Sequence, residues 1–412
     1  MTIRITSPGK ICSSIRLPAS KSISNRALLI NALGRGDSQI ENIADCDDTR
    51  VMAKALSENR EIIDSKAAGT AMRFLTAYYS ITAGKHILTG TGRMKQRPVA
   101  ILTEALKQLG ADISYMEKEG FPPLQINGKK LSGNVLTLKG NVSSQYISAL
   151  MMIAPLLEGG LTLHLTEKII SRPYIDLTLK LMKVFGAAGE WQSLDRIQIY
   201  PQPYQTIHFK VENDWSAASY WYEIASLCNV AQIELTGLYG ESMQGDSKVK
   251  DLFKQLGVET FFTDSGIKLQ KTSCKTKKLE YDFTDQPDLA QTLAVTCAMK
   301  GIPFRFSGLH SLRIKETDRI GALVNELGKL GVSVTVDQDA TIFWDGKKKE
   351  MMQDVAIETY DDHRMAMAFA PVCLILPEIR INDPEVVSKS YPKFWNDLSL
   401  AGFVIQQELA TE

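Results

Sequence analysis

The chain has 412 residues, of which 44% are hydrophobic and 23% charged, and its 47 Lys and Arg residues balance 47 Asp and Glu residues. This balance argues against a chain built as a whole to bind nucleic acid or an anionic membrane, so any anion-binding site must be assembled locally. No apolar run approaches the roughly 18 residues of a membrane span, and the length suggests about two domains.

Residues 1–8 lack the charged-then-apolar pattern of a secretory signal, which predicts a first strand in a cytoplasmic protein. The six cysteines form no CxxC or CxxH pair, and the five histidines also lack metal-ligand spacing. We therefore expect reduced structural thiols, no metal and no cofactor.

The segment 17–30, LPASKSISNRALLI, predicts a helix that starts near Ser20 or Ser22, where a hydroxyl can accept from free backbone N–H groups. Its first turn would present Lys21 and Arg26 beside those N–H donors, as an anion site requires. Lys21 is a mobile point charge, whereas Arg26 is a permanently charged fork that suits phosphate or carboxylate. A capped surface helix is the simpler alternative for this stretch alone.

Helix-start signals followed by Ala-rich apolar runs recur along the chain at residues 21, 69, 143, 214, 288 and 361. The intervals are 48, 74, 71, 74 and 73 residues, so the repeat length is nearly constant after a shortened first unit. Second helices are predicted near residues 47, 97, 172, 246, 316 and 391, and short β-branched segments separate the helices. The pattern predicts a mixed α/β protein with six units of strand, helix, strand, helix, strand and strand.

Three units per domain is the natural division of these repeats. We expect residues 19–213 to form one domain, with its first unit shortened, and residues 1–18 plus 214–412 to form the other. The chain would then cross twice between the domains, which makes a hinge.

Oddly placed polar residues gather at the helix starts and the adjoining loops. Each cluster by itself could be solvated charge, but equivalent ends of a repeated unit can converge on one cleft between the domains. Gly69 and Thr70 start such a helix, where the absent side chain would let an anion approach the N–H groups. No P-loop or dinucleotide fingerprint is present. The other clusters are residues 93–98, 143–145, 313–319, 361–364 and 388–390.

Ten separated motifs, in order along nearly the whole chain, resemble the signatures of the 3-phosphoshikimate 1-carboxyvinyltransferases, or EPSP synthases. They are LPASKSISNRALL, GTAMR, RMKQRP, SSQ, SRPYID, SMQGD, QPDLAQ, RIKETDR, DDHRMAM and SKSYPKFW. The resemblance implies a two-domain inverted α/β barrel with the active site in the interdomain cleft. It also implies transfer of the enolpyruvyl group of phosphoenolpyruvate to the 5-hydroxyl of shikimate 3-phosphate, with release of phosphate.

The resemblance also implies roles for individual residues. The residues expected to bind shikimate 3-phosphate are Lys21, Ser22, Arg26, Ser143, Ser144, Gln145, Ser171, Tyr174, Asp288, Ser311 and Lys315. The residues expected to bind phosphoenolpyruvate are Lys21, Gly69, Thr70, Arg97, Gln145, Arg319, Arg364 and Lys389.

The expected catalytic residues are Lys21, Asp288, Glu316 and His363. Asp288 would accept the hydroxyl proton, Glu316 with Lys21 nearby would protonate the methylene carbon, and His363 would support them. The resemblance leaves the division of acid and base roles among Lys21, Asp288 and Glu316 open.

The chain departs from the family pattern at three positions and in the shortened first unit. Ala67 stands where Asn is common, Phe74 where Pro is usual and Ser311 where Asn is frequent, which puts the surroundings of Gly69 and the response to glyphosate in question.

One rival function is that of the related transferase that acts on UDP-N-acetylglucosamine, but its loop cysteine has no counterpart in residues 89–95. The other rival interpretation is a non-catalytic phosphate-binding repeat protein. We expect a monomer with no nucleic-acid or membrane partner.

Overall fold

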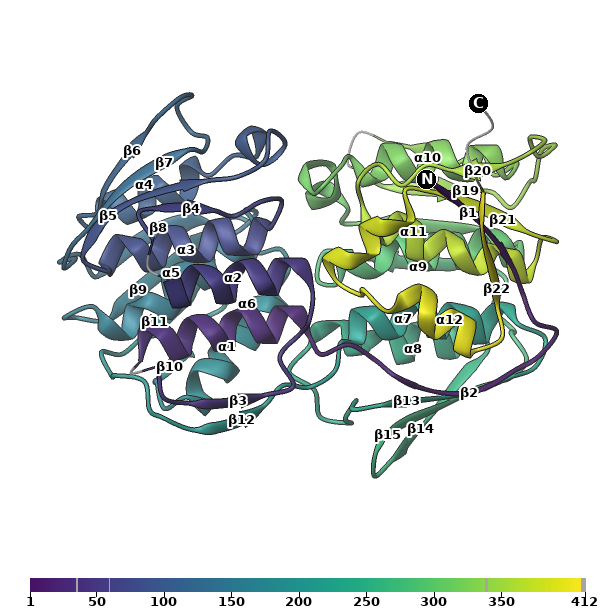
Figure 1. Ribbon diagram of the computed structural model, residues 1–412, viewed down its shortest axis with the longest axis horizontal. Coiled ribbons are helices and arrows are strands. Elements are labelled where there is room, and N and C mark those ends of the chain that lie inside the picture. The colour runs from purple at the N-terminus through teal and green to yellow at the C-terminus, as the bar shows by residue number, and fades with distance from the viewer. Residues whose placement is uncertain (35, 59, 338–339, 409–412) are drawn as a thin grey trace. The chain divides into compact units, whose positions relative to one another are not determined.

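A computed structural model describes residues 1–34, 36–58, 60–337 and 340–408 (Figure 1). The chain folds into two compact units. Unit 1 comprises Met1–Pro18 and Glu212–Glu412, and unit 2 comprises Ala19–Val211. The chain therefore starts in unit 1, forms all of unit 2 as one insertion, and returns.

Unit 2 contains two four-stranded sheets and one two-stranded sheet among its described residues. The first sheet has the order β4 (Ile62–Asp64), β5 (Gly84–Thr89), β7 (Leu124–Gly128) and β6 (Asp112–Tyr115). The second has the order β8 (Val135–Lys139), β9 (Leu161–Thr166), β11 (Arg196–Ile199) and β10 (Gly189–Trp191). The two-stranded sheet pairs β12 (His208–Lys210) with β3 (Gln39–Glu41) in parallel.

The described part of unit 1 contains three four-stranded sheets. The first has the order β2 (Ile11–Arg16), β13 (Ala231–Thr236), β15 (Gly266–Lys271) and β14 (Val258–Thr263). The second has the order β16 (Leu279–Asp282), β17 (Phe304–Ser307), β19 (Ile342–Trp344) and β18 (Thr335–Val336). The third has the order β20 (Ala356–Ile357), β21 (Ile379–Asn382), β1 (Thr2–Thr6) and β22 (Val404–Glu408). The N-terminal strand β1 thus pairs with two strands from the C-terminal part of the chain.

All five four-stranded sheets share one pairing scheme. The first strand in each order runs parallel to the second, and the remaining two neighbouring pairs are antiparallel. A parallel pair needs a crossover connection, and in four of these sheets the connection contains a helix. Between β2 and β13 the connection includes all of unit 2. The two-stranded sheet retains only the parallel pair, in the region where the sequence predicts a shortened unit. The mixed α/β class is confirmed, while the count of six repeats stays a prediction.

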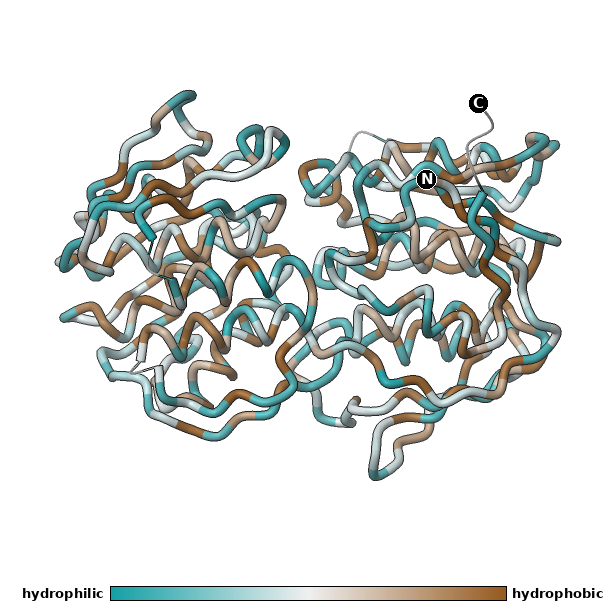
Figure 2. The backbone as a smooth tube through the Cα atoms, viewed as in Figure 1, coloured by the Kyte–Doolittle hydropathy of each residue, from teal (hydrophilic) through white to brown (hydrophobic). Residues whose placement is uncertain are grey.

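Three helices in each unit contact one another. In unit 2 they are α1 (Lys21–Leu33), α3 (Gly69–Ile81) and α5 (Ser144–Ile153), and in unit 1 they are α7 (Trp215–Leu227), α9 (Ala290–Lys300) and α11 (His363–Phe369). We call these six the inner helices. Most of their residues are buried, including many Ala and Ser residues that permit close helix approach. Figure 2 shows hydrophobic residues distributed along the helices and strands of each unit.

The remaining α-helices flank the inner ones. They are α2 (Asp47–Glu58), α4 (Ala100–Gln108), α6 (Arg172–Val184), α8 (Val249–Gln255), α10 (Arg319–Lys329) and α12 (Phe394–Leu400). The short 3-10 helices are η1 (Met94–Gln96), η2 (Ala154–Leu156), η3 (Gly245–Lys248), η4 (Pro287–Leu289), η5 (His310–Ile314), η6 (Ala370–Leu374) and η7 (Pro384–Lys389). Across the described residues, no helix is both long and apolar enough to cross a membrane.

Several predicted boundaries match the structure and others are shifted by local turns. Ser20 caps α1, as predicted, and its hydroxyl accepts from the backbone N–H of Ile23 at 3.4 Å. The helix predicted near residue 97 begins three residues later, because η1 and an extended Arg97 precede it. The β-branched segment 332–336 (VSVTV) forms only a two-residue strand, Thr335–Val336.

Candidate functional site

The starts of the inner helices in unit 2 bring several predicted residues together. Lys21 is the first residue of α1, and its ammonium group forms an ion pair with Asp48 of α2 at 3.2 Å. Asp48 is buried, whereas the Lys21 side chain remains 16% exposed. The pair holds a cation at a helix N-terminus while leaving its ammonium accessible to a ligand. Asp48 is absent from the sequence prediction, because nothing in the DDTR segment indicates that it faces α1.

Arg26 is 2% exposed and lies in a polar network inside unit 2. Its Nε donates to Thr178 Oγ1 at 2.8 Å, its Nη2 to Ser148 Oγ at 3.2 Å, and its Nη1 to the Ser22 carbonyl at 2.9 Å. Burial lowers the pKa of Arg26 to about 10, so the guanidinium is still charged at neutral pH. These bonds join α1, α5 and α6 and fix the guanidinium group.

Gly69 begins α3 and lies under two guanidinium groups. A Cβ atom at this position would lie 2.6 Å from Nη1 of Arg73 and 2.6 Å from Nη1 of Arg97. Both arginines are at least nine-tenths buried. The glycine is therefore required for space, and a helix start beside two cations has the chemistry that suits an anion. Arg73 is part of the GTAMR motif, but the sequence assigns it no role.

The start of α5 faces the start of α3. Gln145 donates from its side-chain amide to Thr70 Oγ1 at 3.0 Å, and Ser143 caps α5 by accepting from the Gln145 backbone N–H at 3.4 Å. Ser144 is buried at the first position of α5. The predicted residues of helices α3 and α5 are thus in direct contact.

The start of α6 supplies two further predicted residues of unit 2. Ser171 precedes α6 in a left-handed conformation (φ 55°) and is buried. Tyr174 lies in the first turn of α6, and its carbonyl accepts from Thr178 of the Arg26 network at 2.8 Å. Both residues therefore belong to the same end of unit 2 as the Arg26 network.

In unit 1, Arg319 joins the starts of three helices. It is 1% exposed and contacts Asp288 of η4 at 3.0 Å, Glu316 at 2.9 Å and Asp362, which caps α11, at 2.6 Å. Burial lowers the pKa of Arg319, but the three carboxylates outweigh it and raise the pKa above its ordinary value. The guanidinium group is therefore permanently charged and bound within unit 1.

Asp288 forms ion pairs with three cations. Besides Arg319, its carboxylate contacts Arg364 at 2.8 Å and Lys315 at 3.6 Å. Burial opposes ionisation of Asp288, but Arg364, Lys315 and Arg319 together hold its pKa well below the usual range. Burial also lowers the pKa of Lys315, which the charge of Asp288 partly offsets.

The other predicted residues of unit 1 surround this group. Lys389 lies 3.3 Å from Glu316, so Glu316 is ion-paired to two cations. His363 is the first residue of α11, is 1% exposed, and its Nδ1 lies 3.7 Å from Asp362. Ser311 is part of η5, which leads to Lys315.

Two further residues of this cluster lie outside the predicted set. Tyr220 of α7 accepts from Arg364 Nη1 at 3.3 Å. Asp246 of η3 is buried and accepts from the hydroxyl of Ser216 at the start of α7. Burial and the nearby charge of Asp288 raise the pKa of Asp246 to about 7. The SMQGD motif includes Asp246, whereas no sequence signal connects Tyr220 with a residue 144 positions away.

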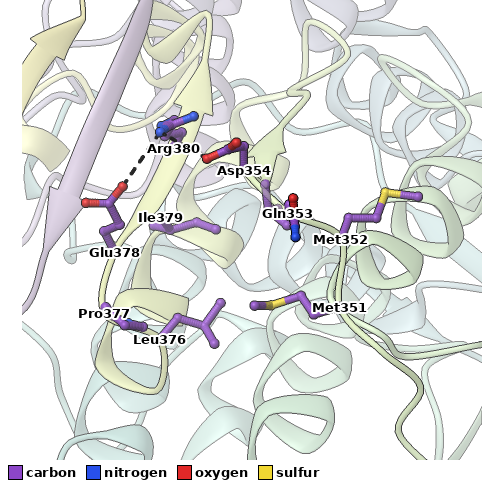
Figure 3. A pocket seen from close by; sticks show the side chains of 10 residues that line it. Met351, Met352, Gln353, Asp354, Leu376, Pro377, Glu378, Ile379 and Arg380 are labelled. Atoms are coloured by element: carbon purple, nitrogen blue, oxygen red, sulfur yellow. Dashed lines mark ion pairs between the residues drawn. The ribbon is translucent and has the colours of Figure 1, made fainter.

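A pocket of about 490 Å³ lies elsewhere in unit 1 (Figure 3). Its walls combine apolar side chains such as Met351 and Leu376 with Arg380, whose guanidinium group is ion-paired to Glu378 at 3.9 Å and Asp354 at 3.7 Å. None of the predicted site residues lines it, and its cation is already neutralised by carboxylates. We therefore assign the candidate site to the helix starts.

Each unit thus presents one cluster in which helix N-termini, cations and carboxylates meet. We call them the Lys21 cluster, in unit 2, and the Asp288 cluster, in unit 1. Exposed or part-buried cations beside free N–H groups are suited to phosphate and carboxylate ligands. The described residues contain no group of three His, Cys, Asp or Glu side chains arranged for a metal. The fold and clusters define a mixed α/β protein in which each unit has a group of cations and helix N-termini whose chemistry suits anionic ligands.

Comparison with known proteins gives the family. The family model for EPSP synthase (3-phosphoshikimate 1-carboxyvinyltransferase) matches residues 5–60 and 57–398, so the chain belongs to this family. A 3-phosphoshikimate 1-carboxyvinyltransferase of Bacteroides fragilis (strain YCH46) is 57% identical over 406 residues, covering 98% of this chain and 99% of the relative. One from Pasteurella multocida (strain Pm70) is 36% identical and covers 93% of each chain.

Solved structures show the same fold. The EPSP synthase of Acinetobacter baumannii has a TM-score of 0.79 at 21% identity, covering 99% of this chain and 100% of that one. The enolpyruvyl transferase NikO from Streptomyces tendae has a TM-score of 0.74 at 16% identity, covering 98% of each chain.

Proposed function

We propose that this chain transfers the enolpyruvyl group of phosphoenolpyruvate to the 5-hydroxyl of shikimate 3-phosphate. The hydroxyl oxygen forms a new bond to C2 of phosphoenolpyruvate, giving a tetrahedral intermediate, and the C2–O bond to phosphate then breaks. The hydroxyl loses a proton, and the methylene carbon gains one and later releases it. Family membership supports this reaction. The observation that carries the proposal is the pair of clusters, because both substrates are anionic and one cluster combines cations with a carboxylate base candidate.

We assign the shikimate 3-phosphate contacts to both clusters, since helix starts and hydroxyls suit its phosphate. The proposed residues are Lys21, Ser22, Arg26, Ser143, Ser144, Gln145, Ser171, Tyr174, Asp288, Ser311 and Lys315. Arg26 would act mainly by fixing the first turn of α1, because three of its nitrogens already donate within unit 2.

We assign the phosphoenolpyruvate contacts to the cations around Gly69 and around Asp288. The proposed residues are Lys21, Gly69, Thr70, Arg97, Gln145, Arg319, Arg364 and Lys389. Both proposed sets contain residues of both units, so we further propose that the two clusters act across an interdomain cleft.

The cations around Asp288 give its proposed role as base a physical requirement. In the ligand-free chain they hold the pKa of Asp288 well below the usual range, which makes the carboxylate a weak proton acceptor. Arg364 and Arg319 would form ion pairs with the bound, anionic phosphoenolpyruvate, and the negative charge of the substrate would offset their effect on Asp288. The proton affinity of Asp288 would then rise, so binding of one substrate would activate the base that acts on the other.

Glu316 and Lys21 are the proposed proton donors to the methylene carbon, and His363 is a proposed positioning residue beside Asp362. Glu316 is ion-paired with Arg319 and Lys389 in the ligand-free chain. As an ionised carboxylate it has no proton to give, so to act as an acid it must first take up a proton, which becomes easier when Arg319 and Lys389 pair with the substrate instead. The Lys21 ammonium group needs no such step. Acid–base groups of this kind typically contribute about a hundredfold or more to turnover.

We also propose a monomeric, cytoplasmic enzyme without nucleic-acid or membrane partners. The rival reaction on UDP-N-acetylglucosamine lacks support, because residues 89–95 contain no cysteine and the family model is that of EPSP synthase. A non-catalytic phosphate-binding repeat protein would bind both anions without turnover.

A phosphate-release assay separates these possibilities. Purified protein should release phosphate only when phosphoenolpyruvate and shikimate 3-phosphate are both supplied. Replacing shikimate 3-phosphate with UDP-N-acetylglucosamine should give no release. Absence of release with the first pair would remove the proposed reaction, and release with the sugar nucleotide would favour the rival.

A further inference from the structure

Arg73 is a buried cation to which the proposed substrate sets give no role. It lies on α3, one turn after Gly69, and is 4% exposed. Its Nη1 donates to the Gly69 carbonyl at 2.8 Å, which brings the guanidinium group back over the start of its own helix. There it meets Arg97, since the Nη1 atoms of both arginines lie 2.6 Å from the position of a Cβ on residue 69.

Neighbours from α5 hold both arginines in this arrangement. The Arg73 guanidinium carbon lies 5.8 Å from the centre of the Tyr146 ring, within the range of a cation–π contact. The Tyr146 hydroxyl donates to the carbonyl of Pro98 at 2.5 Å, and Pro98 directly follows Arg97. One tyrosine therefore supports Arg73 with its ring and the Arg97 segment with its hydroxyl.

Two guanidinium groups so close together repel each other, and burial strengthens the repulsion. Arg97 is 8% exposed, yet the described part of the chain gives its guanidinium no carboxylate partner and its buried Nε no hydrogen-bond acceptor. A ligand with negative charge at the start of α3 would relieve both the repulsion and the missing acceptor. The arrangement thus favours an anion above Gly69.

We propose that Arg73 is a positioning residue that aims Arg97 at phosphoenolpyruvate and limits the space above Gly69. This inference rests on the proposed function. Arg73 acts through Arg97 and through the Gly69 carbonyl. The Nη1 atoms of Arg73 and Arg97 each lie 2.6 Å from the position of a Cβ on residue 69, so a substituent that extends toward the Cα of Gly69 would meet both guanidinium groups. The anion would therefore contact the guanidinium groups themselves and would not lie between them and the glycine.

The test is a double-mutant cycle between positions 69 and 73, with KM for phosphoenolpyruvate and kcat measured separately. Arg73→Lys should raise KM about tenfold and change kcat less than about threefold, because binding geometry is lost while the acid–base groups stay. Gly69→Ala should raise KM about tenfold or more in the wild-type background. In the Arg73→Lys background the same change should raise it about threefold or less, because one of the two crowding guanidinium groups is gone.

Two controls keep the test specific. Arg196→Lys, an exposed arginine on β11, should leave both constants unchanged. Tyr146→Phe keeps the ring and removes only the hydrogen bond to Pro98, so it should also raise KM for phosphoenolpyruvate, by a smaller factor than Arg73→Lys. It replaces Arg73→Lys in the test if that variant does not fold. Folding is checked by melting temperature.

The outcomes are distinct from those of the proposed function. Wild-type protein without turnover would remove the proposed function itself. Wild-type turnover together with unchanged KM in Arg73→Lys and Tyr146→Phe, or with fold-changes that simply multiply in the double variant, would overturn the role of Arg73.

Discussion

Two aspartates of the same cluster differ in charge because they differ in neighbours. Asp288 faces Arg364, Lys315 and Arg319 and stays ionised, whereas Asp246 is buried beside that negative charge and has a pKa of about 7. The ionisation of Asp246 therefore changes the net charge that an anionic substrate meets in unit 1.

The first prediction concerns the ionisation of Asp246. As the pH rises through about 7, Asp246 gains a negative charge near Arg364 and Asp288, so KM for phosphoenolpyruvate should increase by about threefold to tenfold. Asp246→Asn copies the neutral form and should remove this increase. The check is the KM for phosphoenolpyruvate of both proteins, measured by steady-state kinetics. The pH range runs from about one unit below that pKa to about one and a half units above it. Identical pH profiles would show that Asp246 only accepts the bond from Ser216.

The second prediction concerns the groups proposed to move protons. Lys21→Met and Asp288→Ala should each lower kcat by about a hundredfold or more. Both changes also remove a partner from an ion pair, so the melting temperature is measured to confirm that each variant is folded during the assay. The residual rate is measured by phosphate release at saturating substrate. A variant that retains the wild-type rate would lose its assigned role.

Residue-level prediction from the sequence works where a helix start carries a clear local signal. Caps, a glycine and polar residues before apolar runs indicate Lys21, Gly69, Gln145 and Asp288. The structure brings Gly69, Gln145 and Asp288 beside other predicted residues of their own units, whereas Lys21 pairs with Asp48, which is not among the predicted residues. Asp48 and Tyr220 lie outside the reach of such prediction, because ion pairs and hydrogen bonds between helices depend on packing that local patterns do not encode.

At the scale of the element, the inner helix α7 contains a buried carboxyl group. Glu223 is 0% exposed, and burial raises its pKa well above the usual range, with Thr296 of α9 offsetting only part of that effect. Ser219 and Ser226 lie one turn before and after it on the same helix and are also buried. The inner helices thus combine close packing with polar groups that have no role in the proposed reaction.

The third prediction follows from this carboxyl group. The folded chain keeps a proton on Glu223 at pH values where the unfolded chain has released it, so the free energy of unfolding should fall as the pH rises above the ordinary carboxyl range. The slope from one group is at most ~1.4 kcal/mol per pH unit. Glu223→Gln should reduce this slope, as measured by urea unfolding at several pH values. Parallel pH profiles for the two proteins would contradict it.

Element boundaries show where local reasoning stops. Helix type and order follow from the repeated apolar runs, but η1, η4 and η5 lie where the sequence predicts α-helix starts or loops. In each case the backbone makes a 3-10 turn before the α-helix, and the competition between these hydrogen-bond patterns is decided by neighbouring elements.

At the scale of the whole molecule, the chain passes from unit 1 to unit 2 and back. The repeated βαβ order explains why each unit gathers helix starts at one cluster, since equivalent helices of a repeat point the same way. The sequence does not predict the strand pairing of the N-terminal β1 with β21 and β22, because partners from opposite ends of the chain leave no local signal.

The fourth prediction tests whether one chain supplies both clusters. Lys21→Met alters unit 2 and Asp288→Ala alters unit 1, so a mixture of the two proteins should remain as inactive as each alone if the enzyme is monomeric. Rates of phosphate release from the mixture and from each variant check this. Recovery of activity on mixing would show that clusters from different chains complement each other.

Conversion followed by phosphorus NMR tests the proposed reaction most directly. With wild-type protein, the signals of phosphoenolpyruvate and shikimate 3-phosphate should fall together while inorganic phosphate and one new phosphate ester rise in equal amounts. With Asp288→Ala the same mixture should change about a hundredfold more slowly. Phosphate that forms without consumption of shikimate 3-phosphate, or no conversion by the wild-type protein, would contradict the account.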